Sequence, residues 1–170
     1  LVGDGGAINY YLSGILASVT ATAGTGGNDA VTIGDGNVTA LLGEGDDTLT
    51  VLDGNVIVAG GVGQDTIDAG LGQHLVLGDN GTIDLDTDGA LVAMTTLDTL
   101  GAADSVTLGD GSNVVILGQG SDTLTTGTGS DIVLGDNGEI RYTGATGALV
   151  RDRIASLNEA NGGDDVLTLG

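Results

Sequence analysis

Glycines and apolar residues recur along this chain with a period of nine residues. Written in nines from Gly24, the sequence has glycine at the fourth position of seven successive units and an apolar residue at the eighth position of the first six. The pattern resumes at Thr99 for four full units, and a last partial unit follows at Gly163. The eighth-position residues of the two runs are Val31, Ala40, Leu49, Val58, Ile67, Val76, Val106, Val115, Leu124 and Val133.

Each nine predicts a tight turn followed by a short strand. Glycine allows the positive φ that the turn needs, and the strand then points alternate residues inward and outward. Two nines make one coil of 18 residues, with the eighth-position side chains stacked inside. The predicted fold is therefore all-β, a parallel β-roll or β-helix solenoid that runs as a single segment through residues 1–170, with about eight coils at ~4.8 Å spacing.

A longer repeat overlies the nonapeptides. The strings LVGDGGAI, LVLGDNGTI and IVLGDNGEI begin at residues 1, 75 and 132, and a looser segment follows each. The regular coils are expected at 24–83, 99–140 and 161–170, and the looser segments at 7–23, 84–98 and 141–160. The lengths fit enlarged coils, so we expect enlarged coils there; hairpins that project from the stack are the alternative.

Composition narrows both the core and the partners. The chain has 34 glycines and no Pro, Cys, Trp or Phe, which predicts a thin aliphatic core and argues against collagen. Its net charge of −21 opposes binding to nucleic acid or to anionic membrane surfaces. No apolar run is long enough to insert into a membrane as a helix. Acidic side chains in this number suggest hard cations, or simply solubility.

The nonapeptide resembles that of the RTX family, GGxGxD followed by x, an apolar residue and x. The match is complete in Gly60-Gly61-Val62-Gly63-Gln64-Asp65-Thr66-Ile67-Asp68 and close in the units around Asp47 and Asp122. The resemblance implies a parallel β-roll, a secreted bacterial protein, and Ca²⁺ held between stacked turns by the sixth-position aspartates and turn carbonyls. Carried over to this chain, the implied ligands are Asp29, Asp47, Asp65, Asp104, Asp122 and Asp165, with Asp79 and Asp136 of the GDNG strings as further candidates.

Electrostatics favours the same assignment on one side of the coil. Carboxylates stacked about 5 Å apart repel by about 1 kcal/mol per pair in water, and a divalent cation with oxygen ligands reverses that sign. The competing interpretation is that these aspartates only cap turns, and it is the favoured one for Asp35, Asp53 and Asp110. The sixth position of the other side holds Val38, Val56, His74, Asn113 and Asp131, so a metal site is not expected there, and a lone histidine does not predict zinc.

The outward positions also differ between the two sides. One side is rich in threonine, at 32, 48, 50, 66, 107, 123, 125 and 168. The other is apolar, and a strand that is apolar on both faces is usually covered. We expect a partner, a neighbouring copy or the looser segments to cover that outer face, which consists of Leu41, Ile57, Leu75, Leu77, Val114, Ile116, Ile132 and Leu134.

These observations predict an extracellular or cell-surface, calcium-binding structural repeat of the adhesin, spacer, surface-layer or filament type that folds when Ca²⁺ binds. The chain begins and ends within the pattern, so we expect a segment of a longer protein. An enzyme is not expected, because one histidine and no cysteine leave no common nucleophile and base pair. The alternatives are an ice-binding solenoid that uses the threonine face, a self-assembling filament subunit, and the secretion module of a larger hydrolase.

Overall fold

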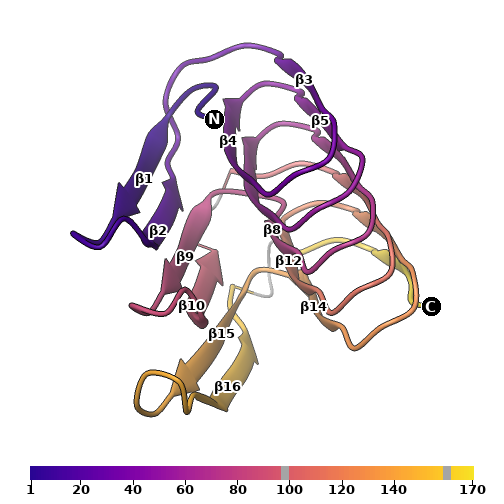
Figure 1. Ribbon diagram of the computed structural model, residues 1–170. Helices are drawn as coiled ribbons and strands as arrows, with labels where there is room; N and C mark the ends of the chain where they lie inside the picture. Colours follow the sequence, from indigo (N-terminus) through magenta and orange to yellow (C-terminus); the bar gives the residue numbers. More distant parts are fainter. Residues whose placement is uncertain (97–99, 159–161) are drawn as a thin grey trace.

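The computed structural model describes residues 1–96, 100–158 and 162–170, and within these ranges it contains β-strands and no helix. The strands form three sheets (Figure 1). The threonine sheet consists of β3 (Ala30–Ile33), β5 (Thr48–Val51), β7 (Thr66–Ala69), β11 (Ser105–Leu108), β13 (Thr123–Thr126) and β17 (Val166–Thr168). The middle sheet consists of β4 (Val38–Glu44), β6 (Val56–Val62), β8 (Leu75–Leu77), β12 (Val114–Gly118) and β14 (Ile132–Asp136). The hairpin sheet consists of β1 (Gly6–Tyr10), β2 (Leu16–Ala21), β9 (Gly81–Leu85), β10 (Leu91–Thr96), β15 (Gly138–Thr143) and β16 (Val150–Ser156).

The threonine and middle sheets are parallel and together form the predicted solenoid. Val31 pairs with Leu49, and Ala40 with Val58, so neighbours in the stack are 18 residues apart. The same in-register pairing continues from β7 to β11 and from β13 to β17, although more residues separate those strands in the sequence. The solenoid has about six turns of about 18 residues, fewer than the eight expected, because the looser segments leave the stack.

The eighth-position side chains form the solenoid core, as predicted. Leu49, Val58, Ile67, Val76 and Val115 are completely buried between the two sheets. They belong to one cluster with the other inward residues of both sheets, and Val31 and Val133 pack against it at its ends. The core is one aliphatic layer thick, which fits a chain without Phe or Trp.

The looser segments are antiparallel hairpins, so the expectation of enlarged coils is wrong. Within the hairpins Ile8 pairs with Val19, Ile83 with Met94, and Ile140 with Ile154. The hairpins cover residues 6–21, 81–96 and 138–156, so the second and third begin inside ranges expected to be regular coils. The expected boundaries at 98/99 and 160/161 lie outside the described residues.

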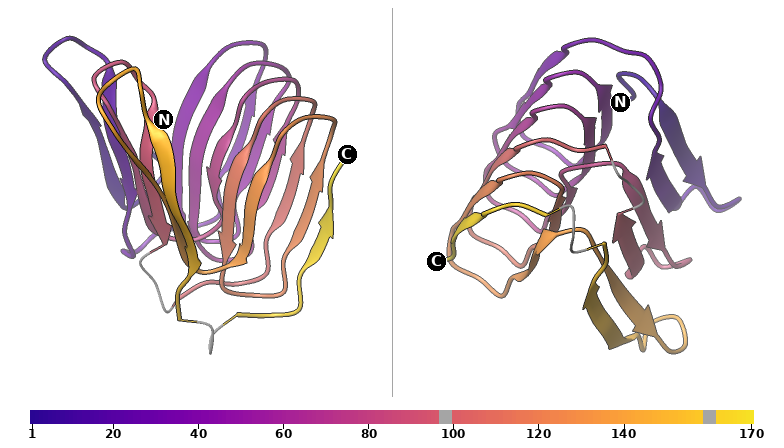
Figure 2. Two further views of the ribbon diagram at one scale, coloured as in Figure 1. Left: turned by 90° about the horizontal axis from the view of Figure 1, so that it is seen from below. Right: turned by 180° about the vertical axis from the view of Figure 1, so that it is seen from behind.

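The hairpin sheet covers the outer face of the middle sheet. The second and third hairpins follow the middle-sheet strands β8 and β14, and the first follows a bridge between Val2 and Leu41. All three fold over that face, and neighbouring hairpins pair, Val19 with Ile83 and Met94 with Ile140 (Figure 1). Figure 2 shows the threonine, middle and hairpin sheets side by side. Between the last two lies a second apolar cluster, in which Leu41, Leu77 and Ile116 are completely buried. The other five residues of the predicted apolar face, Ile57, Leu75, Val114, Ile132 and Leu134, are partly buried against it. The sequence left open whether a partner, a neighbouring copy or the looser segments cover this face. The looser segments do so, because each hairpin turns the apolar side of its strands toward that face.

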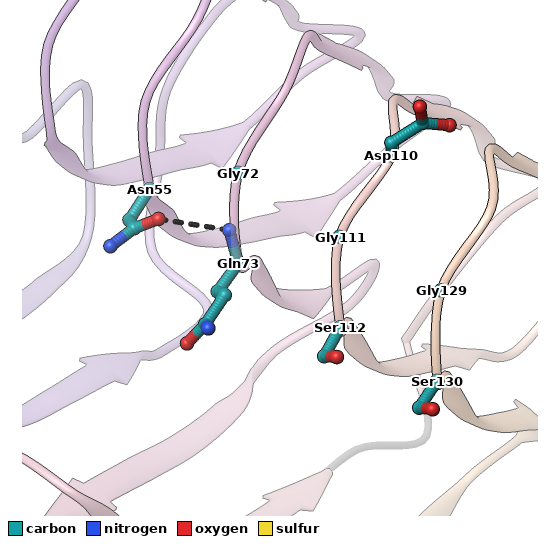
Figure 3. Close-up of a pocket in the computed structure, with 8 residues that line it drawn as sticks. All are labelled: Asn55, Gly72, Gln73, Asp110, Gly111, Ser112, Gly129 and Ser130. Atoms are coloured by element: carbon teal, nitrogen blue, oxygen red, sulfur yellow. Dashed lines mark hydrogen bonds between the residues drawn. The ribbon is translucent and has the colours of Figure 1, made fainter.

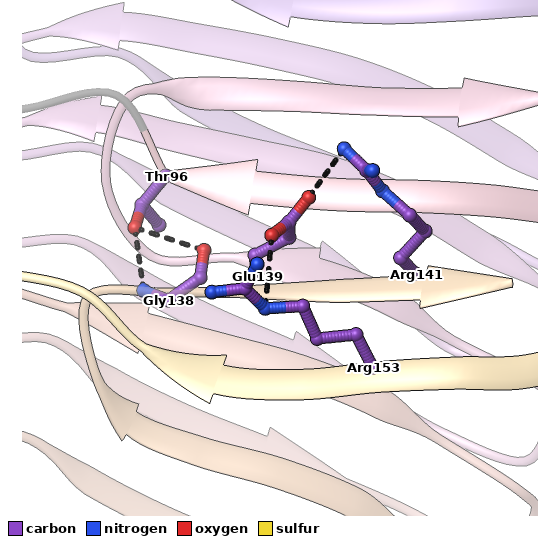
Figure 4. Close-up of polar contacts among 5 residues, drawn as sticks. All are labelled: Thr96, Gly138, Glu139, Arg141 and Arg153. Atoms are coloured by element: carbon purple, nitrogen blue, oxygen red, sulfur yellow. Dashed lines mark hydrogen bonds and ion pairs between the residues drawn. The ribbon is translucent and has the colours of Figure 1, made fainter.

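Hydrogen bonds join the third hairpin to the second, and two ion pairs lie within the third hairpin (Figure 4). Gly138 N donates a hydrogen bond to Thr96 Oγ1 at 2.9 Å. Glu139 forms ion pairs with Arg141 at 2.6 Å and with Arg153 at 3.4 Å. Both arginine side chains remain about half exposed. Among the described residues, none forms a helix that could cross a membrane.

Candidate metal centre

The six sixth-position aspartates form one column along the turns that lead into the threonine sheet. We call this set, Asp29, Asp47, Asp65, Asp104, Asp122 and Asp165, the aspartate column. In the five members after Asp29, Oδ1 accepts the backbone N–H of the preceding member at 2.7–3.0 Å, from Asp29 N bonded to Asp47 through Asp122 N bonded to Asp165. The column passes both later hairpins without a break: Asp65 N donates to Asp104 Oδ1 at 2.9 Å although 39 residues separate them. The structure therefore brings together all six residues that the resemblance implied.

The second carboxylate oxygen of the column lacks a protein partner. Asp47, Asp65, Asp104 and Asp122 are 1–3 % exposed, and the Oδ2 atom of each is buried without a hydrogen bond. A buried, unpartnered carboxylate oxygen costs several kcal/mol unless a charge compensates it. Capping of the preceding coil uses only Oδ1 and leaves Oδ2 without a hydrogen bond.

Main-chain carbonyls lie beside these free oxygens. A Cβ added at Gly60 would collide with both Asp65 Oδ2 and the carbonyl oxygen of Gly78. One added at Gly78 would collide with both Asp104 Oδ2 and the carbonyl oxygen of Leu117. Glycine at these positions therefore leaves a cradle into which a carboxylate and a carbonyl of the next coil both project.

Burial makes the carboxylates of the column unusually hard to ionise. It raises the pKa of Asp104 to about 9, of Asp65 to about 7 and of Asp122 to about 6, with the neighbouring carboxylates adding to the shift. The pKa of Asp47 and that of Asp165 are also raised, again chiefly by burial. A cation that balanced these charges would be stabilised by the same low-dielectric surroundings.

Asp79 and Asp136 do not belong to the column; they lie beside it at the bases of the hairpins. Asp136 Oδ1 accepts Gly163 N at 3.2 Å, where the chain returns from the third hairpin. Asp79 is fully buried, its Oδ2 accepts Gln119 N, and its Oδ1 has no hydrogen-bond partner. Burial raises the pKa of Asp79 to about 8. Asp4, a position the sequence reasoning missed, accepts Gly27 N at 3.1 Å in the same way, and the LVGDGG and LVLGDNG strings were the signal.

The turns on the opposite edge of the solenoid form a polar ladder of another kind. Val38 and Val56 offer no ligand, and His74, fully buried, accepts Val56 N through Nδ1 at 3.2 Å. Burial lowers the pKa of His74, which favours the neutral ring. Asp53 and Asp110 accept backbone N–H groups of the next coil at 2.8 and 2.7 Å, which agrees with their prediction as turn residues. Figure 3 shows successive turns of this edge around a shallow cavity of about 490 Å³, with Gln73 N bonded to Asn55 Oδ1 at 2.9 Å.

The donor set of the column suits a hard cation. No cluster of three or more His, Cys, Asp or Glu side chains in the described ranges could enclose a metal by itself. The free oxygens are instead carboxylate Oδ2 atoms next to main-chain carbonyls, the mixture of oxygen ligands that Ca²⁺ takes. The residues present therefore fit Ca²⁺, with turn carbonyls and solvent completing the coordination.

Comparison with known families agrees with this geometry. Four copies of the RTX calcium-binding nonapeptide repeat match residues 42–73 and 96–139. This chain carries RTX calcium-binding repeats. Repeats of this type bind Ca²⁺ and are structural units. They include Asp47, Asp65, Asp104 and Asp122, the four fully buried members of the column. No curated protein and no solved structure matches the chain.

Proposed function

We propose that this chain is a calcium-stiffened spacer of an extracellular, adhesin-type bacterial protein, in which the aspartate column with Asp79 and Asp136 ligates the ions. One observation carries the proposal: four buried carboxylates in a single column each keep one oxygen without a protein partner. RTX repeats are typical of secreted bacterial proteins, which supports the extracellular location.

The mechanism follows from the charge of the chain. At a net charge of −21, a one-layer aliphatic core has to overcome the repulsion of carboxylates stacked coil on coil. Calcium binds the folded column and not the separated carboxylates, so it stabilises the folded state by about 2.7 kcal/mol per site at 100 times the Kd. Where calcium is scarce the chain stays unfolded, and where it reaches millimolar levels the coils stack.

A calcium titration monitored by far-UV circular dichroism, starting from a calcium-depleted sample of the full chain, tests this function. We expect a transition from coil to β structure at micromolar to millimolar calcium that magnesium does not reproduce. Ca²⁺ is larger and accepts irregular arrangements of oxygen ligands, whereas Mg²⁺ requires nearly octahedral geometry. A β spectrum that is insensitive to calcium removal would refute calcium-driven folding and leave a solenoid held by its aliphatic core.

The threonine sheet supports a second candidate, binding to ice. Its register aligns Thr32, Thr50, Thr107, Thr125 and Thr168 in one outward column. Asp68 interrupts that column, and threonine favours strands in any case, so the calcium function has the stronger support. Thermal hysteresis of the calcium-loaded chain decides the matter: its presence, and its loss in Thr50→Lys, would establish ice binding.

A further inference from the structure

The opposite edge of the solenoid contains the chain's one histidine, which the calcium function does not use (Figure 3). His74 is completely buried. It belongs to the row of sixth-position residues on that edge, which consists of Val38, Val56, His74, Asn113 and Asp131. A buried imidazole has to satisfy both ring nitrogens within the protein, so its hydrogen bonds decide what it does there.

Two backbone groups from neighbouring coils hold the ring of His74 in one neutral form. Its Nδ1 accepts the N–H of Val56 at 3.2 Å, and its Nε2 lies 3.0 Å from the carbonyl oxygen of Gly70. A carbonyl oxygen only accepts hydrogen bonds, so Nε2 carries the proton and Nδ1 offers its lone pair. The ring therefore joins the coil of Val56 to the coil of Gly70, and it does so only while Nδ1 is unprotonated.

Oxygen atoms play the same part in the next two coils of the row. Asn113 Oδ1 accepts His74 N at 3.2 Å, and Asp131 Oδ1 accepts Asn113 N at 2.9 Å and Asn113 Nδ2 at 3.0 Å. An amide oxygen accepts hydrogen bonds at every pH, and a carboxylate does so down to acidic pH. His74 is thus the member of the row whose acceptor is lost when the pH falls from 8 to 5.

A proton on Nδ1 would leave two N–H groups facing each other. Val56 is completely buried, so water cannot replace the acceptor that its N–H would lose. A buried donor without a partner costs its full desolvation penalty. Gly72 packs closely against the ring, because a Cβ added there would lie 2.9 Å from His74 Cε1. The ring therefore cannot take up a proton in place, and protonation requires the two turns to separate.

The charges near His74 do not offset this cost. Burial lowers the pKa of His74 and outweighs two opposing effects, its hydrogen bond to Gly70 and the negative charge of Asp131. Asp131 lies beyond Asn113 in the row, and its Oδ1 already accepts two hydrogen bonds from that residue. The other acidic residues of these turns occupy exposed positions, at Asp35, Asp53 and Asp110. The neutral ring is therefore the form that the folded chain holds.

We propose that His74 is an acid-sensitive latch on the opposite edge of the solenoid. In its neutral form the ring holds the coil of Val56 to the coil of Gly70, and protonation breaks that link so that the two turns separate. The aspartate column lies on the other edge and keeps its own hydrogen bonds, so acid opens the solenoid on one side. The inference goes beyond the proposed function, because it stands whether or not calcium drives folding.

Proton NMR of the full chain tests the neutral ring directly, because a chain with a single histidine has unambiguous imidazole signals. In the folded, calcium-loaded chain we expect the pKa of His74 to lie clearly below the ordinary value of about 6.5. The urea-unfolded chain is the control, and there the ring should titrate near the ordinary value. A ring that titrates at about 6.5 or above in the intact fold would overturn the proposal, since the turn would then accept the proton.

Urea unfolding of His74→Asn beside the wild type measures the effect on stability. Asparagine keeps an Oδ1 that can accept Val56 N, as Asn113 Oδ1 accepts His74 N, but it does not titrate. Because the folded pKa is the lower one, neutral His74 stabilises the fold above about pH 6.5, and that stability is lost as the pH falls. Between pH 7 and pH 5 the unfolding constant of the wild type should rise by up to about 25-fold more than that of the variant. The comparison cancels the contribution of the aspartates, which both chains share, and equal responses to acid would rule out the latch.

Amide hydrogen exchange at pH 5 locates the opening. Relative to its intrinsic rate, the amide of Val56 should exchange faster in the wild type than in His74→Asn. The amide of Asp47, which donates to Asp65 Oδ1 at 2.9 Å in the aspartate column, should exchange equally in both chains. Equal protection of Val56 in the two chains would show that the turn stays closed in acid and would overturn the proposal.

Discussion

Replacing Asp104 by asparagine should stabilise the calcium-free chain strongly and the calcium-loaded chain much less. Without calcium, the folded chain must hold a proton on Asp104 at pH 7, because burial raises its pKa from 3.8 to about 9. Taking up that proton lowers the free energy of unfolding by 1.36 kcal/mol for each pH unit between the unfolded pKa of 3.8 and pH 7, which is about 4 kcal/mol. Asparagine avoids this cost and keeps the Oδ1 that accepts Asp65 N at 2.9 Å.

The amide nitrogen of the variant would also find a partner. Asp104 Oδ2 and the carbonyl oxygen of Leu117 converge beside Gly78, so an Nδ2–H group in place of Oδ2 can donate to that carbonyl. We therefore expect Asp104→Asn to raise the stability of the calcium-free chain by up to about 4 kcal/mol. With calcium, the variant lacks one carboxylate ligand. Calcium should therefore stabilise the variant by about 2.7 kcal/mol less than it stabilises the wild type, if the missing site was at 100 times its Kd.

Far-UV circular dichroism at pH 7 measures both effects, as the fraction of β structure in calcium-depleted buffer and as the urea midpoint in millimolar calcium. Asp110→Asn is the control, because Asp110 is exposed and its Oδ1 caps Thr128 N at 2.7 Å on the opposite edge. It should behave as the wild type in both buffers. The reasoning would be refuted if Asp104→Asn were less stable than the wild type without calcium and were stabilised by calcium as much as the wild type is. In that case Oδ2 would neither destabilise the calcium-free chain nor bind calcium.

Three other predictions concern protons, the hairpin cluster and the glycine stack. Burial raises the pKa values of Asp65, Asp79 and Asp104 to about 7, 8 and 9, so the folded calcium-free chain binds more protons than the unfolded one between about pH 4 and pH 9. Its free energy of unfolding should therefore fall as the pH rises through that window; a β signal that grows with pH in calcium-depleted buffer would contradict this. Met94→Ala should cost about 2–5 kcal/mol in urea unfolding, because Met94 is completely buried beneath the hairpin sheet, whereas Leu12→Ala at an exposed tip should change stability by less than about 0.5 kcal/mol; equal effects would argue against the packing. Gly61→Ala should lower the urea midpoint in calcium, since Gly61 has φ of +120° and a Cβ would collide with the carbonyl of Gly43; an unchanged midpoint would mean that the coils can separate there.

The nonapeptide pattern was sufficient to predict the solenoid because each of its positions has one physical role. Glycine at the turns and an apolar residue at the eighth position fix both the strand and the side that faces inward. The pairing of Val31 with Leu49 and of Ala40 with Val58 follows directly from the 18-residue coil. The column of sixth-position aspartates is a consequence of the same register.

The hairpins could not be predicted from length alone. From Gly81 to Ala102 is 21 residues, which accommodates one coil with three extra residues as well as a hairpin with a return. The alternation around Ile83 suits a strand in either arrangement. The better signal was the apolar outer face of the middle sheet, because Leu41, Leu77 and Ile116 needed a cover that the solenoid itself does not supply.

The fate of each carboxylate oxygen was also beyond the sequence. The repeat identifies Asp47 and Asp65 as neighbours in a column, but both the capping and the calcium interpretations predict that. Only the structure shows that Oδ1 caps the preceding coil while Oδ2 stays buried without a hydrogen bond, so that capping and ion binding can be compatible in one side chain.

The hairpins and the aspartate column are linked through the turns from which the hairpins emerge. Each hairpin leaves the stack at the turn edge that carries the column, and each departure supplies one more carboxylate: Asp4, Asp79 or Asp136. The second departure lies in the middle of the stack, where Asp65, Asp79 and Asp122 surround Asp104 closely enough to raise its pKa beyond the effect of burial. The column ends, Asp29 and Asp165, are only partly buried. A cation removes the most carboxylate repulsion and burial cost where the carboxylates are most buried and closest together. The centre of the column should therefore bind calcium first, and the second hairpin should become ordered together with it.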